Sequence, residues 1–155
     1  MRKLYWILLS ISVVGCGGGS TSSGVSQSPP PPNNQISSLS AFALLAPIDR
    51  MYVEKHLTSY SYRPSNSGVD PGDGHLYIGE DNWSGWNEYG KAAVLVHEAC
   101  HIAHRHTLDC SPAGERLCNA EMVNALWRAY EYQGVTADYG LINYIESLDG
   151  THCYD

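Results

Sequence analysis

The chain has 155 residues, of which 43% are hydrophobic, and this length and composition fit one globular domain. Nine basic residues face sixteen acidic ones, so the formal net charge is −7. No basic cluster occurs in the sequence, and the charge balance therefore argues against nucleic acid as a partner.

The first fifteen residues have the order of a secretory leader. Two basic residues precede an apolar run over residues 4–14 that is too short to span a bilayer comfortably. Residues 13–16, with the sequence VVGC, resemble the lipobox of bacterial lipoproteins. The resemblance implies cleavage before Cys16, lipidation of that cysteine, and an exported protein held to the membrane of the cell envelope by its lipid. Gly17 favours the outer membrane over the inner one.

Residues 16–38 follow as a tether that is rich in Gly and Ser and then in Pro. This stretch has too little apolar content to bury a core, and we expect it to lift the following domain off the lipid surface. The folded domain is then predicted over residues 39–155, as a mostly helical α+β unit. We expect helices over residues 40–46, 48–60, 87–107, 112–133 and 138–147, a loop over 62–74, a turn over 81–86, and one clear strand at residues 75–79.

The motif that organises the domain is His97-Glu98-Ala99-Cys100-His101, inside the predicted helix over 87–107. Two histidines four residues apart lie about 40° apart around a helix and can bind one metal ion together. Glu98 lies about 100° from His97, where its carboxylate can take a proton from a water molecule on the ion. The motif predicts a zinc site in which Glu98 is the general base.

The third ligand is expected on the next helix. If the two helices form an antiparallel hairpin that turns at Ser111, Glu121 is as far after the turn as His101 is before it. Glu115 lies too near the turn to be level with His101, so it is not the expected ligand. Two histidines, Glu121 and one position left to water form a catalytic zinc set.

The pattern His97-Glu98-x-x-His101 followed by Glu121 resembles that of gluzincins, the thermolysin-like zinc metallopeptidases. The resemblance covers some 25 residues and implies one Zn²⁺ ion held by His97, His101 and Glu121. It also implies a zincin-like fold in which a β-strand beside the motif helix holds a peptide substrate. That strand is predicted to consist of His75, Leu76, Tyr77, Ile78 and Gly79.

Four cysteines remain after Cys16, and an exported chain is expected to pair them in two disulfides with three possible connectivities. In one of these, Cys110 with Cys118 would close a short loop, and Cys100 with Cys153 would then tie the C-terminus to the motif helix. His152 would then lie beside the site, where it is our candidate donor to the oxyanion.

The sequence therefore predicts zinc-dependent hydrolysis of peptide bonds, acting on a peptide or protein of the cell envelope. One alternative is a zinc-binding, disulfide-stabilised envelope lipoprotein that has no catalytic activity and binds a protein partner. Another is a helical envelope domain without metal. Stoichiometric zinc and Glu98-dependent cleavage distinguish the three.

Overall fold

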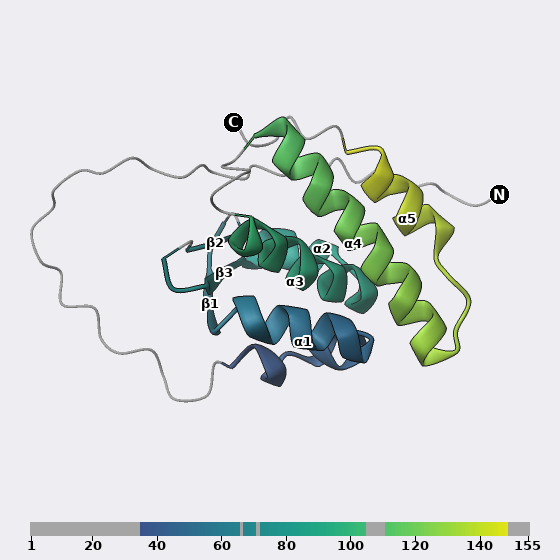
Figure 1. Cartoon of the computed structure of the whole chain (residues 1–155), viewed down its shortest axis with the longest axis horizontal. Helices are drawn as coiled ribbons and strands as arrows, with labels where there is room; N and C mark the ends of the chain where they lie inside the picture. The colour runs from purple at the N-terminus through teal and green to yellow at the C-terminus, as the bar shows by residue number, and fades with distance from the viewer. Residues whose placement is uncertain (1–34, 66, 71, 105–110, 149–155) are drawn as a thin grey trace, which may run out of the picture.

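The computed structural model describes residues 35–148, apart from 66, 71 and 105–110 (Figure 1). The leader, most of the tether, Cys16, Cys110, His152 and Cys153 lie outside the described residues. The elements are η1 (Ile36–Ser38), η2 (Ser40–Leu44), α1 (Pro47–His56), β1 (Ser59–Arg63), β2 (Gly68–Val69), β3 (His75–Gly79), α2 (Glu80–Gly85), α3 (Glu88–Ala103), α4 (Pro112–Gln133) and α5 (Tyr139–Glu146). This confirms a mostly helical α+β fold with a small sheet.

The sheet has three strands in the order β1-β3-β2. β1 pairs with β3 in parallel, from Ser59 opposite His75 to Arg63 opposite Gly79, whereas β2 pairs with β3 antiparallel. Side chains alternate along β3, so Leu76 and Ile78 are fully buried while His75 and Tyr77 are half-buried on the other face. The predicted strand at residues 75–79 is confirmed, and it is the central strand of the sheet.

The motif helix α3 runs through the middle of the domain, with α1 and α4 beside it (Figure 1). Its apolar face, which includes Leu95, Val96 and Ala99, is almost fully buried. These side chains share one core with the sheet and with residues from the N-terminal 3₁₀ helices. Ile36, at the predicted end of the tether, belongs to the same core and is 2% exposed, so the folded part begins before residue 39.

A second apolar cluster joins the first half of α3 to the middle of α4 and to α5. Ala93 of α3 packs there with Met122 and Leu126 of α4, and Ile142 and Ile145 of α5 close the cluster. α4 begins as the sequence predicts, with Ser111 as N-cap and Pro112 in the first turn. It ends at Gly134, whose φ of 65° lies in the left-handed region that glycine adopts without strain.

One ion pair ties α1 to α4. Asp49, 3% exposed, accepts hydrogen bonds from Arg128 Nε at 2.9 Å and from Arg128 Nη2 at 2.6 Å. This geometry is bidentate, so both carboxylate oxygens have a charged donor.

Several boundaries differ from the expected ones. The helix predicted over 48–60 ends at His56, and the next residues form β1, which the sequence analysis did not predict. The turn predicted over 81–86 contains the short helix α2. The motif helix ends at Ala103 instead of residue 107, with His104 as its C-cap.

Within the described ranges, no helix has both the length and the apolar character that crossing a bilayer requires.

Candidate metal centre

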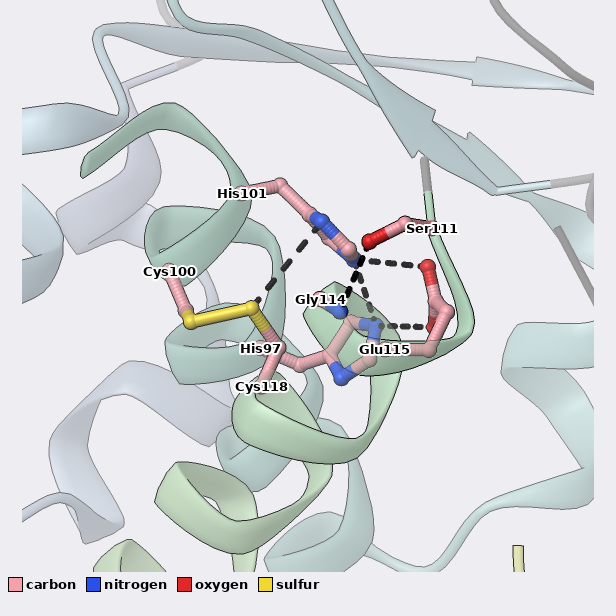
Figure 2. Close-up of polar contacts among 7 residues, drawn as sticks. All are labelled: His97, Cys100, His101, Ser111, Gly114, Glu115 and Cys118. Atoms are coloured by element: carbon pink, nitrogen blue, oxygen red, sulfur yellow. Dashed lines mark hydrogen bonds and ion pairs between the residues drawn. A yellow bond between two sulfur atoms is a disulfide. The ribbon is translucent and has the colours of Figure 1, made fainter. Parts of the chain in front are cut away.

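The two motif histidines lie in the last half of α3, on the side opposite its buried apolar face. Their Nε2 atoms are 3.0 Å apart and their rings meet edge to face (Figure 2). The side chains of His97 and His101 are 15% and 18% exposed, so both are largely buried but still accessible to solvent. The predicted helix has therefore brought both imidazoles to one point.

The first turn of α4 supplies a carboxylate at the same point. Ser111 Oγ accepts a hydrogen bond from Gly114 N at 3.1 Å, which fixes the start of the helix and leaves Glu115 in its first turn. Glu115 is 7% exposed, although it lies only three residues after the first residue of α4. The positive end of the helix dipole favours an ionised carboxylate at this position.

Glu115 meets both histidines (Figure 2). Its Oε2 atom lies 3.4 Å from His97 Nε2, and its Oε1 atom lies 3.1 Å from His101 Nε2. Zinc bonds to histidine and carboxylate are about 2.0–2.1 Å long, so the ligand atoms of a tetrahedral site lie about 3.3 Å apart. The separations are close to this length, although the two distances to Glu115 end on different oxygens. One ligand atom from each of the three residues lies within 4.8 Å of the others, and in the described part of the chain this is the one group of three that can hold a metal ion.

The electrostatics of the group keep the carboxylate ionised. Burial alone would raise the pKa of Glu115, but hydrogen bonds with His101 and His97 outweigh burial and hold this pKa far below its ordinary value. Burial alone would lower the pKa of His101, but its hydrogen bond to Glu115 and the charges of Glu98 and Glu115 raise it overall. An ionised, buried carboxylate facing two imidazole nitrogens is a donor set that suits a divalent cation.

Glu98, the predicted base, follows the first ligand on α3 and is 8% exposed. Its negative charge contributes to the raised pKa of His101, so its carboxylate acts on the centre electrostatically. It does not belong to the group of three whose ligand atoms lie within 4.8 Å of one another. The HExxH motif likewise predicts that this carboxylate is not one of the metal ligands.

Glu121, the third ligand that the sequence predicts, does not join the group, and Glu115 takes that place beside the histidines. Glu121 lies farther along α4. The raised pKa of Arg128 is due mainly to the hydrogen bonds that Arg128 donates to Asp49, and the charge of Glu121 adds to it. The pKa of Tyr52 is raised mainly by burial, and the charge of Glu121 raises it further. The cause of the difference is the length of α3: because this helix ends at Ala103, His101 is level with the first turn of α4 and therefore with Glu115.

The observed disulfide joins Cys100 to Cys118, with Cα atoms 5.5 Å apart. Both predicted pairs, Cys110 with Cys118 and Cys100 with Cys153, are therefore wrong. The pairing itself carried the missing signal about the third ligand. Cys100 precedes His101 by one residue and Cys118 follows Glu115 by three, so this pairing implies the same register of the two helices that places Glu115 beside the histidines.

The expected role of β3 as an open substrate edge is also wrong, because β1 and β2 pair with its two sides. The edge strand on the side of α3 is β2, which contacts that helix. Asp70 N donates to His75 O at 2.8 Å, and hydrogen-bonded pairs alternate along an antiparallel ladder. The next residue of β2 whose main-chain groups point toward β3 is thus Gly68. The main-chain N–H and C=O of Val69, which lies between Gly68 and Asp70, point away from β3 toward the outer edge of the sheet.

No family model, no curated protein and no solved structure matches this chain.

Proposed function

We propose that this protein is a zinc-dependent hydrolase of peptide bonds, with His97, His101 and Glu115 as metal ligands. The observation that carries the proposal is the convergence of two imidazole nitrogens and one buried carboxylate at separations of 3.0, 3.1 and 3.4 Å. Three protein ligands leave a fourth position for water or substrate, as in catalytic zinc sites. When bound, the ion would supply Lewis acidity, which polarises a carbonyl and lowers the pKa of water.

Glu98 is the general base of the proposal. It follows a ligand by one residue on α3, which turns its carboxylate about 100° away from His97 and beside the centre. There it would accept a proton from the attacking water and deliver it to the leaving amine. At 8% exposure, its side chain is largely shielded from bulk water.

The outer edge of β2 favours a peptide as the substrate. An extended chain can add to a sheet edge through main-chain hydrogen bonds, and Val69 directs one N–H and one C=O outward on the strand that contacts α3. A peptide held there would lie beside the motif helix. We infer export and lipid anchoring in the cell envelope as the setting, from the lipobox-like residues at Cys16 and from a disulfide typical of oxidising compartments.

The test compares the full chain with its Glu98→Gln variant. Both should bind one zinc ion per chain, because Glu98 is not a ligand. The variant should lose about 10²- to 10⁴-fold in the cleavage rate of a peptide library, which is the usual contribution of a general base. Ester and phosphoester substrates serve as the control for substrate class. Equal peptide cleavage by both proteins would refute the base assignment, and absence of zinc from both would refute the metal centre.

The second candidate is a zinc-binding envelope protein that does not hydrolyse peptides. The closed geometry favours it, since the ligand side chains are at most 18% exposed and a disulfide lies beside them. This candidate predicts stoichiometric zinc in the wild-type chain without cleavage of any peptide. The same pair of proteins therefore separates the two functions.

A further inference from the structure

We propose that the Cys100–Cys118 disulfide is the positioning element of the metal centre, which it preorganises for the ion by fixing the first turns of α4 against the last turns of α3. The inference rests on the metal centre of the proposed function, but it does not depend on peptide hydrolysis. It assigns to two cysteines a role in metal affinity that goes beyond closing a loop.

The two half-cystines lie on the same helix faces as the ligands. Cys100 is three residues after His97 and one before His101, and Cys118 is three residues after Glu115. Residues three or four apart are neighbours on a helix surface, with a rise of about 1.5 Å per residue. The disulfide therefore lies within about one helical turn of ligands on both helices. A shift of α4 relative to α3 at the disulfide would also shift the ligands.

Apolar packing fixes the other end of this helix pair. Ala93 on α3 and Leu126 on α4 belong to the second apolar cluster, four residues before His97 and eleven after Glu115. At the ligand end, the helices are joined by the contacts of Glu115 with the two histidines and by the disulfide. Without the disulfide, α4 can open about its apolar end, and such an opening displaces Glu115 most.

The disulfide also contacts a ligand directly. Cys118 Sγ lies 3.9 Å from Nδ1 of His101, whereas Nε2 of the same ring faces Glu115 (Figure 2). The group that meets the second nitrogen of a metal-binding histidine sets the orientation of its ring. Both sulfur-bearing residues are completely buried, so this contact excludes water from the back of the ring.

The centre needs such a constraint before an ion arrives. Glu115 is 7% exposed, and its two carboxylate oxygens face His97 and His101 across the contact between α3 and α4. A buried carboxylate gains solvation by swinging outward when the helices separate. Holding the helices together in advance removes that cost from the free energy of metal binding.

The experiment measures zinc affinity, by competition with a chromophoric chelator, for the wild-type chain and for Cys100→Ala/Cys118→Ala. Loss of a group that orients a metal ligand costs about 10- to 100-fold in metal affinity, and we expect a loss of this size. Arg128→Met is the matched control, because it destabilises the contact between α1 and α4 but lies away from the ligands and should keep wild-type affinity. Cys100→Ala/Cys118→Val, which refills the buried volume, repeats the test if the first variant folds poorly.

Cobalt in place of zinc gives a second readout. The intensity of its visible absorption bands reports tetrahedral geometry, which should change in both cysteine variants and not in the Arg128 control. Wild-type zinc affinity and an unchanged cobalt spectrum in a folded cysteine variant would overturn the positioning role alone. An equal loss in the Arg128 control would also overturn it, since general destabilisation would then explain the effect. Failure of the wild-type chain to bind zinc would instead overturn the proposed function.

Discussion

Two buried carboxylates of this domain have opposite kinds of partner. Asp49, 3% exposed, meets the guanidinium of Arg128, a cation at every accessible pH. Glu115, 7% exposed, meets two imidazoles, which carry a charge only when they are protonated. Both carboxylates contact α4 or lie on it, and both link that helix to another one.

The difference separates a structural ion pair from a site that can accept a ligand. The charge of Asp49 is already balanced inside the protein, so a divalent cation would have to displace Arg128 to bind there. Glu115 faces two imidazoles, which can release their protons when a metal ion binds. A cation can therefore replace protons at Glu115 without leaving a buried group uncompensated.

The largest expected effect comes from removing the ligand carboxylate. Glu115→Ala should lower zinc affinity by about 100- to 1,000-fold, which is one ligand's share of the free energy of structural zinc sites. Glu121→Ala is the matched control on the same helix, and it should keep wild-type affinity. Titration against a zinc chelator measures both. A loss in the Glu121 variant with none in the Glu115 variant would restore the ligand set that the sequence predicts.

The next effect concerns stability in the presence of zinc. An ion that binds only the folded state stabilises it by about 2.7 kcal/mol at a free concentration 100 times the dissociation constant. We expect a gain of this size for the wild-type chain and for Arg128→Met, and almost none for Glu115→Ala at the same zinc concentration. Urea unfolding with and without zinc checks the difference. Equal gains in all three proteins would place the ion elsewhere.

The smallest effect concerns the structural pair. Arg128→Met leaves Asp49 buried without a cation and should lower the free energy of unfolding by about 2 kcal/mol, below the cost of a fully buried pair because the Arg128 side chain is 38% exposed. Asp49→Asn in the same chain should recover part of this loss. Urea unfolding of the two variants without zinc measures it. A larger loss in the double variant would show that the charge of Asp49 is not what destabilises the single one.

Local signals predicted the helical part of the fold well. Ser111 and Pro112 fixed the start of α4 and Gly134 fixed its end, because caps act through neighbouring residues. β1 was missed although Ser59-Tyr60-Ser61-Tyr62 alternates with the period of a strand. β2 has only two residues, and its pairing with β3 is set by a contact across a loop that no local pattern encodes.

The sequence predicted those residues of the site whose relative positions depend on a single helix. His97, Glu98 and His101 follow from spacing within α3, whereas the third carboxylate depends on where α3 ends and how α4 approaches it. The prediction centred the turn on Ser111, but α3 ends at Ala103 and α4 begins at Pro112. The middle of the connection therefore lies before Ser111, which makes His101 level with Glu115 and not with Glu121. The disulfide pairing depends on the same approach, so both predictions failed for one reason.

The candidate ligands and the disulfide all lie between His97 and Cys118, in one short stretch of the chain. Contacts so close in sequence form at a low cost in loop-closure entropy and contribute little to contact order. The pairing of β1 with β3 has no part in bringing these groups together. The stretch from His97 to Cys118 thus contains all three candidate ligands and both cysteines of the disulfide, whereas the apolar packing that holds its two helices together comes from residues on either side of it.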